Sequence, residues 1–307
     1  MVSKQTHKNL TWIDLEKPTQ DDVVSIMDEY GINRLVANEL LSPTLRPKVE
    51  LYDNFIYLIL HFPAFKTPKS RKSSEQEQEI DFIIGKDFLI TTHYKTIDPL
   101  HNFSKTFEVN SILDKSNMGE HCGYLFFYLV RQLYKSLEEE LDYVTESLEA
   151  VEEKIFMGQE KKMVEELSKI NRNLLNFKQA TRPHKEVLAS LEIVGKKFFG
   201  EEFSYHLHTI SGEYYKISNI LEANRETVAE LRQTNDSLLN TKTNEIMKIL
   251  TIMAFVTFPL SLFASIFGMN TNTLPLVGHP NDFWIIIGIM LLATICFFAF
   301  FKYKDWI

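Results

Sequence analysis

Two long uncharged runs near the C-terminal end constrain this chain most. The first extends from Ile249 to Phe267 and the second from Phe283 to Phe301, and each holds 19 residues. At 1.5 Å rise per residue such a run forms a helix of about 28 Å, close to the hydrocarbon thickness of a bilayer. In lipid only helices and closed barrels satisfy every backbone polar group, so both runs are predicted to be transmembrane helices.

The charges around these runs predict the orientation of the resulting hairpin. Lys242 and Lys248 precede the first run, and Lys302 and Lys304 follow the second, whereas the connecting segment 268–282 has no lysine or arginine. The positive-inside rule therefore predicts that both termini are cytoplasmic. The N-terminal residues lack an apolar signal sequence, so insertion is expected to use the two internal runs. The expected location is the inner or plasma membrane, with the lipid bilayer as a partner.

Composition excludes several classes of function. The net charge of −8 over 307 residues argues against a nucleic-acid partner, because such proteins usually present a basic face. Only Cys122 and Cys296 are present, so a disulfide framework is not expected. We find neither a glycine-rich phosphate loop nor a catalytic constellation in the sequence, and we therefore expect no enzymatic activity and no organic cofactor.

Upstream of the membrane part, the sequence predicts a mixed domain and then long helices. Residues 1–115 alternate β-rich segments with short helices, and are expected to form an α/β domain. Three helices are predicted in this domain: the first begins near Pro18, the second follows Gly31 and ends at Leu41, and the third is Thr96–Val109. One predicted strand is Thr11–Leu15. Two hairpins are also expected, the first formed by Lys48–Leu51 with Phe55–His61 and the second by Glu79–Ile84 with Phe88–Thr92.

Residues 116–210 are predicted to be an antiparallel helical pair. Tyr124–Phe156 is apolar at helical spacing, Gly158 breaks it, and a second helix is expected from Glu160 to about Leu191 with a kink at Pro183. A stalk helix, 211–248, is then expected to continue into the hairpin, 249–307. The stalk carries a heptad-like seam, which we expect to be covered by self-association because nothing else in the sequence is assigned to cover it. The seam comprises Ile217, Leu221, Asn224, Val228, Leu231, Asn235 and Leu238.

Polar residues recur on one face of the first membrane run. Ser and Thr in membrane helices often line helix contacts, so packing against another helix is one interpretation. The other is a water-filled path, which is favoured by an asparagine at each end of the run, Asn244 and Asn270. Amide oxygens suit Mg²⁺, which releases its water reluctantly. The predicted pore-lining residues are Asn244, Thr251, Ala254, Ser261 and Ser265, and a hydrophobic gate is predicted at Met247, Leu250 and Phe258.

Several motifs together resemble the CorA family of divalent-cation channels. Gly268-Met269-Asn270 closes the first of two C-terminal spans, and Thr243-Asn244-Glu245-Ile246-Met247-Lys248 precedes that span. Further matches occur in order along the chain, at Thr11-Trp12-Ile13, Arg46-Pro47-Lys48-Val49-Glu50, and Arg182-Pro183 with Lys185-Glu186-Val187.

The resemblance implies an α+β fold in which a cytoplasmic α/β domain, long antiparallel helices and a stalk lead into a two-span hairpin, assembled as a funnel-shaped homopentamer. It implies a selectivity mouth at Gly268, Met269 and Asn270, and regulation by cytoplasmic Mg²⁺. Glu39 matches a regulatory acid of the family. Its expected stalk partner falls near the neutral Gln233, so Asp236 is considered as a substitute.

The sequence therefore predicts a channel for passive, potential-driven influx of hydrated Mg²⁺, with Co²⁺ or Ni²⁺ as possible further cargo. Mg²⁺ is expected both as the transported and as the regulatory ion. Two alternatives stay open: a zinc transporter of the same fold, and a membrane-anchored coiled-coil sensor.

Overall fold

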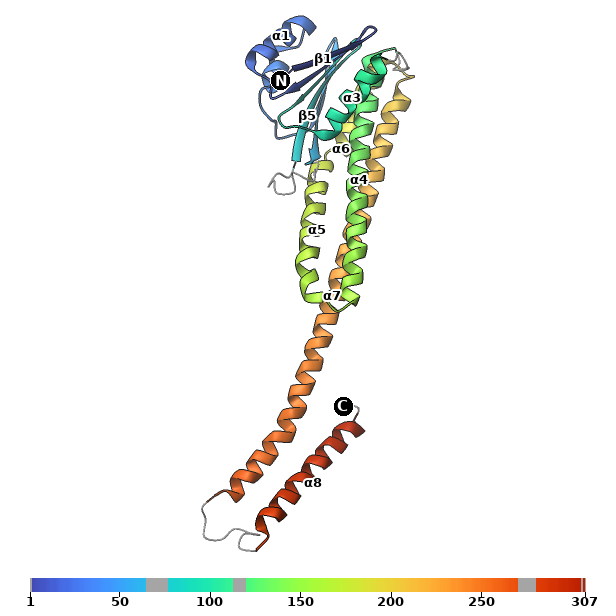
Figure 1. Ribbon diagram of the computed structural model, residues 1–307. Coiled ribbons are helices and arrows are strands. Elements are labelled where there is room, and N and C mark those ends of the chain that lie inside the picture. Colours follow the sequence, from blue (N-terminus) through green and yellow to red (C-terminus); the bar gives the residue numbers. More distant parts are fainter. Residues whose placement is uncertain (1, 65–76, 113–119, 270–279, 305, 307) are drawn as a thin grey trace. The chain divides into compact units, whose positions relative to one another are not determined.

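The computed structural model describes residues 2–64, 77–112, 120–269, 280–304 and 306. They form two compact units, Met1–Arg232 and Gln233–Ile307. The fold is α+β, with a sheet domain, long helices and two C-terminal apolar helices (Figure 1).

A six-stranded sheet forms the centre of the sheet domain, with strand order β1-β2-β6-β5-β4-β3. Only β2 and β6 run parallel, and every other neighbouring pair is antiparallel. All five predicted strands and both predicted hairpins are confirmed. The strands are β1 (Val2–His7), β2 (Leu10–Glu16), β3 (Lys48–Leu51), β4 (Phe55–Pro63), β5 (Glu77–Gly85) and β6 (Phe88–His93).

Strand β1, which pairs with β2 at the edge of the sheet, was not predicted from the sequence. Its sequence, VSKQTH, is polar and four of its six residues are exposed, so it lacks the alternation that reveals a half-buried strand. The predicted start of β5 at Glu79 was also late, because the strand already begins at Glu77.

Helices cover both faces of this sheet (Figure 1). On one face, α1 (Gln20–Tyr30) and α2 (Arg34–Glu39) pack onto a core that includes Tyr57, Ile59 and Ile83. On the other face Trp12 meets Phe103 of α3 (Asp98–Ile112) edge-on at 5.5 Å between ring centroids. Strand β4, which lies between β5 and β3, is buried over all nine residues, which is expected of a strand between two helical layers.

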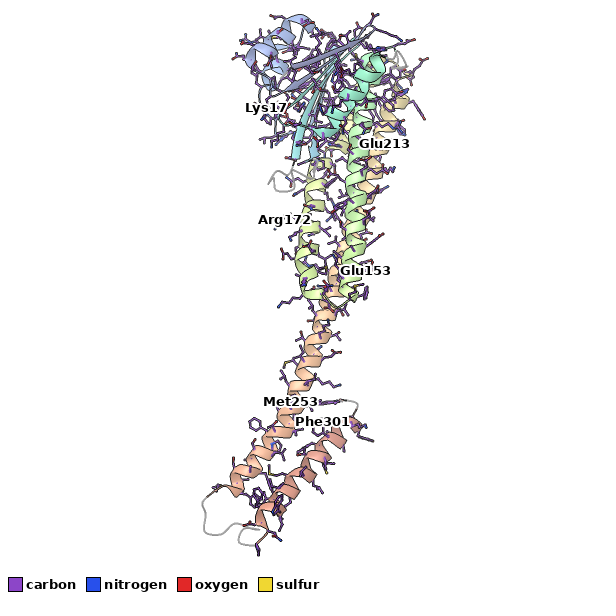
Figure 2. The ribbon with its side chains drawn as sticks, in the orientation of Figure 1. Lys17, Glu153, Arg172, Glu213, Met253 and Phe301 are labelled. Carbon is purple, nitrogen blue, oxygen red and sulfur yellow. The ribbon has the colours of Figure 1, made fainter. Side chains whose placement is uncertain are left out.

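Long helices follow the sheet domain. These are α4 (Cys122–Phe156), α5 (Glu160–Thr181), α6 (His184–Phe199) and α7 (Ser204–Phe267). The expected helix from Glu160 to Leu191 is two helices, because Pro183 has no N–H for the ladder and separates α5 from α6. The stalk helix begins at Ser204 rather than near Ser211, after Gly200 ends α6 with a φ of +99°. Glu153 of α4 and Arg172 of α5 show the charged outer faces of the pair (Figure 2).

From Ile217 to Leu231 the seam of the stalk is covered within the first unit, so our expectation that self-association covers this part was wrong. Ile217, Leu221 and Val228 are each at most 4% exposed in the single chain. Asn224 donates to the Leu141 carbonyl of α4 at 3.2 Å and accepts from the Thr145 hydroxyl at 3.0 Å. The heptad-like spacing therefore reports packing of α7 against its own helical layer, and the buried amide fixes the register of α4 and α7.

A buried histidine joins the sheet to the helices. His184, at the start of α6, donates from Nε2 to the His61 carbonyl of β4 at 2.8 Å. Its Nδ1 therefore accepts the hydroxyl of Tyr134 of α4, at 2.6 Å. Burial lowers the pKa of His184 to about 4, although the bond to His61 opposes this shift. The imidazole is thus neutral at physiological pH and connects α6, α4 and β4.

This depressed pKa predicts a loss of stability in acid. An unfolded histidine takes up its proton near pH 6.5, whereas His184 resists protonation until about pH 4. The free energy of unfolding should therefore fall by about 3 kcal/mol as pH drops through this window. Thermal unfolding of the full-length protein in detergent between pH 4 and 7.5 measures this, and His184→Leu should flatten the profile. His208→Gln, at a side chain that is 81% exposed, is the control and should keep the wild-type profile.

Candidate ion pathway

The second unit contains the end of α7 and the helix α8 (Asp282–Tyr303). Both α7 and α8 contain a stretch long and apolar enough to cross a membrane. Figure 2 labels Met253 on the first of these helices and Phe301 on the second. The apolar window of α7 is 6% buried inside the chain and that of α8 is 0% buried, so nearly all of this apolar surface is available to lipid or to other copies.

Apart from Thr251, the residues of each membrane helix that lose exposure lie along one stripe. The covered stripe of α7 recurs every three or four residues, as does that of α8, so each stripe lies on one helix face. The α7 stripe is entirely apolar and the α8 stripe is mostly apolar, with the polar Asp282 and Thr294 among its members, which indicates that the hairpin closes through a largely apolar face of each helix. On α7 the stripe is Ile252, Val256, Leu260, Phe263 and Phe267, and on α8 it is Asp282, Ile286, Ile287, Met290, Ala293, Thr294, Phe297 and Phe301.

The predicted pore face lies on the other side of α7. At 100° per residue its centre is roughly 170° around the helix from the covered stripe. Of the predicted residues only Thr251 is half-buried, and the remainder are exposed. Contact with α8 therefore does not account for the polar residues on this face. The face comprises Asn244, Met247, Thr251, Ala254, Phe258, Ser261 and Ser265, and Leu250 of the predicted gate is exposed beside it.

Backbone carbonyl groups of α7 already accept some of the hydrogen bonds that side chains on this face can donate. Thr251 donates its hydroxyl hydrogen to the Met247 carbonyl at 2.7 Å, so its oxygen is left to accept from water or an ion's hydration shell. Pro259 lies inside the helix and has no N–H, so it cannot supply the usual helical hydrogen bond to the Phe255 carbonyl. Both features add acceptors within the apolar run, where a cation path needs them.

The predicted selectivity mouth follows the end of α7. The Gly268 N–H donates to the Ala264 carbonyl at 2.9 Å, and the Met269 N–H donates to the Ile266 carbonyl at 3.3 Å. The C-terminal end of a helix presents carbonyl oxygens and the negative end of its dipole, which favours cations. A Cβ on Gly268 would lie 3.2 Å from the Ala264 carbonyl oxygen, so the close turn suits glycine. Asn270 lies outside the described residues.

The predicted regulatory acid Glu39 is already ion-paired within the first unit. It is the last residue of α2, and its carboxylate lies 2.8 Å from Lys48 Nζ, which also contacts Glu50 at 3.1 Å. Burial lowers the pKa of Lys48, but hydrogen bonds to Glu39 and Glu50 raise it by more, so the lysine stays charged. Lys48 therefore competes with any metal cation for the Glu39 carboxylate, a competition that was not predicted from the sequence. Asp236 is exposed on α7 in the second unit.

Within the described part of the chain, no three His, Cys, Asp or Glu side chains gather to hold a metal ion. A sheet domain, long helices and two apolar C-terminal helices define a two-span membrane protein. Residues 7–303 match the family described as CorA-like Mg²⁺ transporter protein, so the chain belongs to that family.

Individual relatives extend over almost the whole chain. It is 26% identical over 298 residues to the cobalt/magnesium transport protein CorA of Thermotoga maritima, covering 97% of this chain and 83% of that protein. It is 23% identical to the protein of the same name in Methanocaldococcus jannaschii, covering 97% and 92%. The solved CorA magnesium transporter from M. jannaschii has the same fold, with a TM-score of 0.84, 21% identity, and coverage of 99% of this chain and 94% of that one.

The tight turn at Gly268 gives a testable consequence. Gly268→Ala should lower Mg²⁺ flux into liposomes about tenfold, because the new methyl group must displace the Ala264 carbonyl at the end of α7. Gly288→Ala in α8 is the matched control, since a Cβ there meets no atom within 4 Å. Equal flux through both variants would contradict a functional role for the helix end.

Proposed function

We propose that this protein is a channel through which hydrated Mg²⁺ enters the cell passively, with Co²⁺ and Ni²⁺ as possible further cargo. One observation carries the proposal. The polar face of α7 points away from α8 and is not covered within the chain, while the apolar face is used for the hairpin. In lipid, exposed Ser, Thr and Asn side chains require a polar neighbour, which other copies or a water-filled path would supply.

A homopentamer arranges these faces around one axis. In the proposed assembly α7 of each copy lines the path, α8 lies outside it, and the sheet domains lie in the cytoplasm with both termini. The relatives named for magnesium or cobalt transport cover nearly the whole chain, and this supports the proposal. It also favours Mg²⁺ over the zinc-transporter alternative.

Different parts of α7, and the residues that follow it, would perform different steps of ion passage. Asn270, with Gly268 and Met269, would receive the hydrated ion, because amide oxygens can bind its water without holding it too tightly to leave. Met247, Leu250 and Phe258 are 57%, 54% and 78% exposed in the single chain, and as rings they would close the path by excluding water. Asn244 would meet the ion at the cytoplasmic end.

The membrane potential is sufficient to drive this influx. Moving a doubly charged ion inward yields about 4.6 kcal/mol per 100 mV, twice the value for a single charge. No energy-supplying reaction is therefore required of the protein.

The direct test of this function is growth of a cell that lacks its own Mg²⁺ uptake. The wild-type protein should restore growth at low Mg²⁺, and Asn270→Ala should reduce rescue to the level of the empty vector. Asn281→Ala is the control, because this N-cap residue of α8 makes no capping hydrogen bond. Equal rescue by wild type and Asn270→Ala, or no rescue by either, would contradict the proposal.

Closure of the path can be tested separately. Phe258→Gly should let Mg²⁺ leak through liposomes at a Mg²⁺ concentration that closes the wild-type channel, with at least about tenfold more flux, since it removes the bulk of the proposed gate. Phe263→Gly makes the same change on the face that packs in the hairpin. If the two variants leak equally, Phe258 is not the gate.

Regulation is proposed to use Glu39 and Asp236 of neighbouring copies. Mg²⁺ bound between them would favour the closed state, which is feedback through differential affinity. Glu39→Ala should therefore raise, by about tenfold, the Mg²⁺ concentration that protects the chain from protease. Glu29→Ala is the control, because Glu29 likewise lies in the last turn of a helix, α1, and pairs with a lysine, Lys4, at 2.6 Å. Identical digestion curves for wild type and Glu39→Ala would remove Glu39 from the sensor.

A further inference from the structure

Two acids share one face of a buried strand beneath α2. Glu79 and Asp81 are two residues apart on β5, so their side chains point to the same side of the sheet. Asp81 is fully buried and Glu79 is 8% exposed. This is the sheet face that α1 and α2 cover, and a carboxyl pair is unusual in such an apolar layer.

Glu79 is well supplied with hydrogen-bond donors. Its carboxylate accepts the Thr44 N–H at 2.7 Å and the Thr44 hydroxyl at 3.2 Å. His61 Nε2 of the neighbouring strand β4 lies 3.1 Å from the same carboxylate. Three polar contacts thus converge on the Glu79 carboxylate, so Glu79 is the member of the pair with the greater hydrogen-bond support.

Asp81 has very little such support. Its Oδ2 receives the Tyr57 hydroxyl at a long 3.4 Å, and its Oδ1 has no hydrogen-bond partner. Lys48, the cation of β3 on this side, is taken by Glu39 and Glu50. An ionised Asp81 would therefore be a buried charge beside another carboxylate, an arrangement that costs several kcal/mol.

Tyr57, His61, Tyr94 and Lys95 are the other titratable groups around the pair. From β4 it faces Tyr57 and His61, of which His61 is bonded to Glu79. Tyr94, which follows β6, is neutral because burial raises its pKa, and its side chain is near enough to hydrogen-bond Asp81. Lys95 lines the same pocket as Glu79 and His61. Burial is the largest cause that raises the pKa of Asp81, followed by the charge of Glu79 and a hydrogen bond to it.

We propose that Glu79 and Asp81 form a proton-binding site that holds one proton at neutral pH, as a carboxylic acid on Asp81 donating to the Glu79 carboxylate. The shared proton converts two acceptors that repel into a donor and an acceptor that attract. It also explains why an oxygen of Asp81 faces no donor, since a protonated oxygen donates instead.

The shared proton stabilises the position of the segment that carries Glu39. Glu79 bonds to Thr44, in the loop that leaves α2, and the Tyr94 hydroxyl donates to the Glu39 carbonyl at 3.4 Å. Loss of the proton would place a second negative charge under this segment and loosen it. The loosened segment would make the proposed cation sensor sensitive to cytoplasmic pH, and in this respect alone the inference rests on the proposed function.

Infrared spectroscopy of the full-length protein in nanodiscs tests the site directly. At pH 7 the wild type should show the carbonyl stretch of a protonated carboxylic acid, shifted in D₂O, and Asp81→Asn should lack it. Asp87→Asn, at an exposed aspartate just after β5, is the control and should retain the band. Absence of the band in wild type, or its persistence in Asp81→Asn, would overturn the proposal. Should Asp81→Asn not fold, the wild-type band must still disappear on alkaline titration.

Hydrogen exchange of residues 34–45 tests the consequence. Wild type and Asp81→Asn should exchange equally at pH 7, whereas at alkaline pH the wild-type segment should exchange at least about threefold faster than the variant, which has no proton to lose. Equal exchange of both proteins at alkaline pH would overturn the link to α2. Neither measurement depends on ion flux, so failure here is distinguishable from failure of the proposed channel.

Discussion

The architecture of the second unit depends on how one helix, α7, distributes its two faces. An apolar stripe from Ile252 to Phe267 is the face that packs in the hairpin, and the stripe with Thr251, Ser261 and Ser265 is left bare. The helix backbone takes the hydroxyl hydrogen of Thr251, but lipid provides no donor for the hydroxyl oxygens, and we propose that other copies or water do so. The proposed assembly, path and gate all follow from this division, and so does the position of the mouth at the end of α7.

Much of the fold could be predicted because it depends on strong local signals. The two charge-free runs identify the membrane helices, and the β-rich segments around Asp53 and Lys86 identify both hairpins. Periodicity also showed that the stalk has a buried face, but it does not say which helix covers that face. The structure places Asn224 against α4 of the same chain, and the covered part of the seam therefore carries no argument for oligomerisation.

The polar details of the first unit could not be predicted, because they bring together residues distant in sequence. Lys48 reaches Glu39 across nine residues, and His184 reaches His61 across 123. In the sequence, Glu79 and Asp81 look like ordinary residues of the predicted strand Glu79–Ile84. Only the register of β5 against β4, with α2 above, shows that they form a buried pair. The spacing of the polar stripe on α7 could be predicted from the sequence, whereas the structure was needed to show that this stripe faces away from α8.

Thiol accessibility tests the central claim most directly. In a Cys296→Ser background, which leaves only the buried Cys122, Ser261→Cys and Phe263→Cys place a thiol on opposite faces of α7. A charged, water-soluble thiol reagent should react with Ser261→Cys in open channels and block Mg²⁺ flux into liposomes, and it should leave flux through Phe263→Cys unchanged. Block of Phe263→Cys with no effect on Ser261→Cys would contradict the assignment of the bare polar face to the ion path.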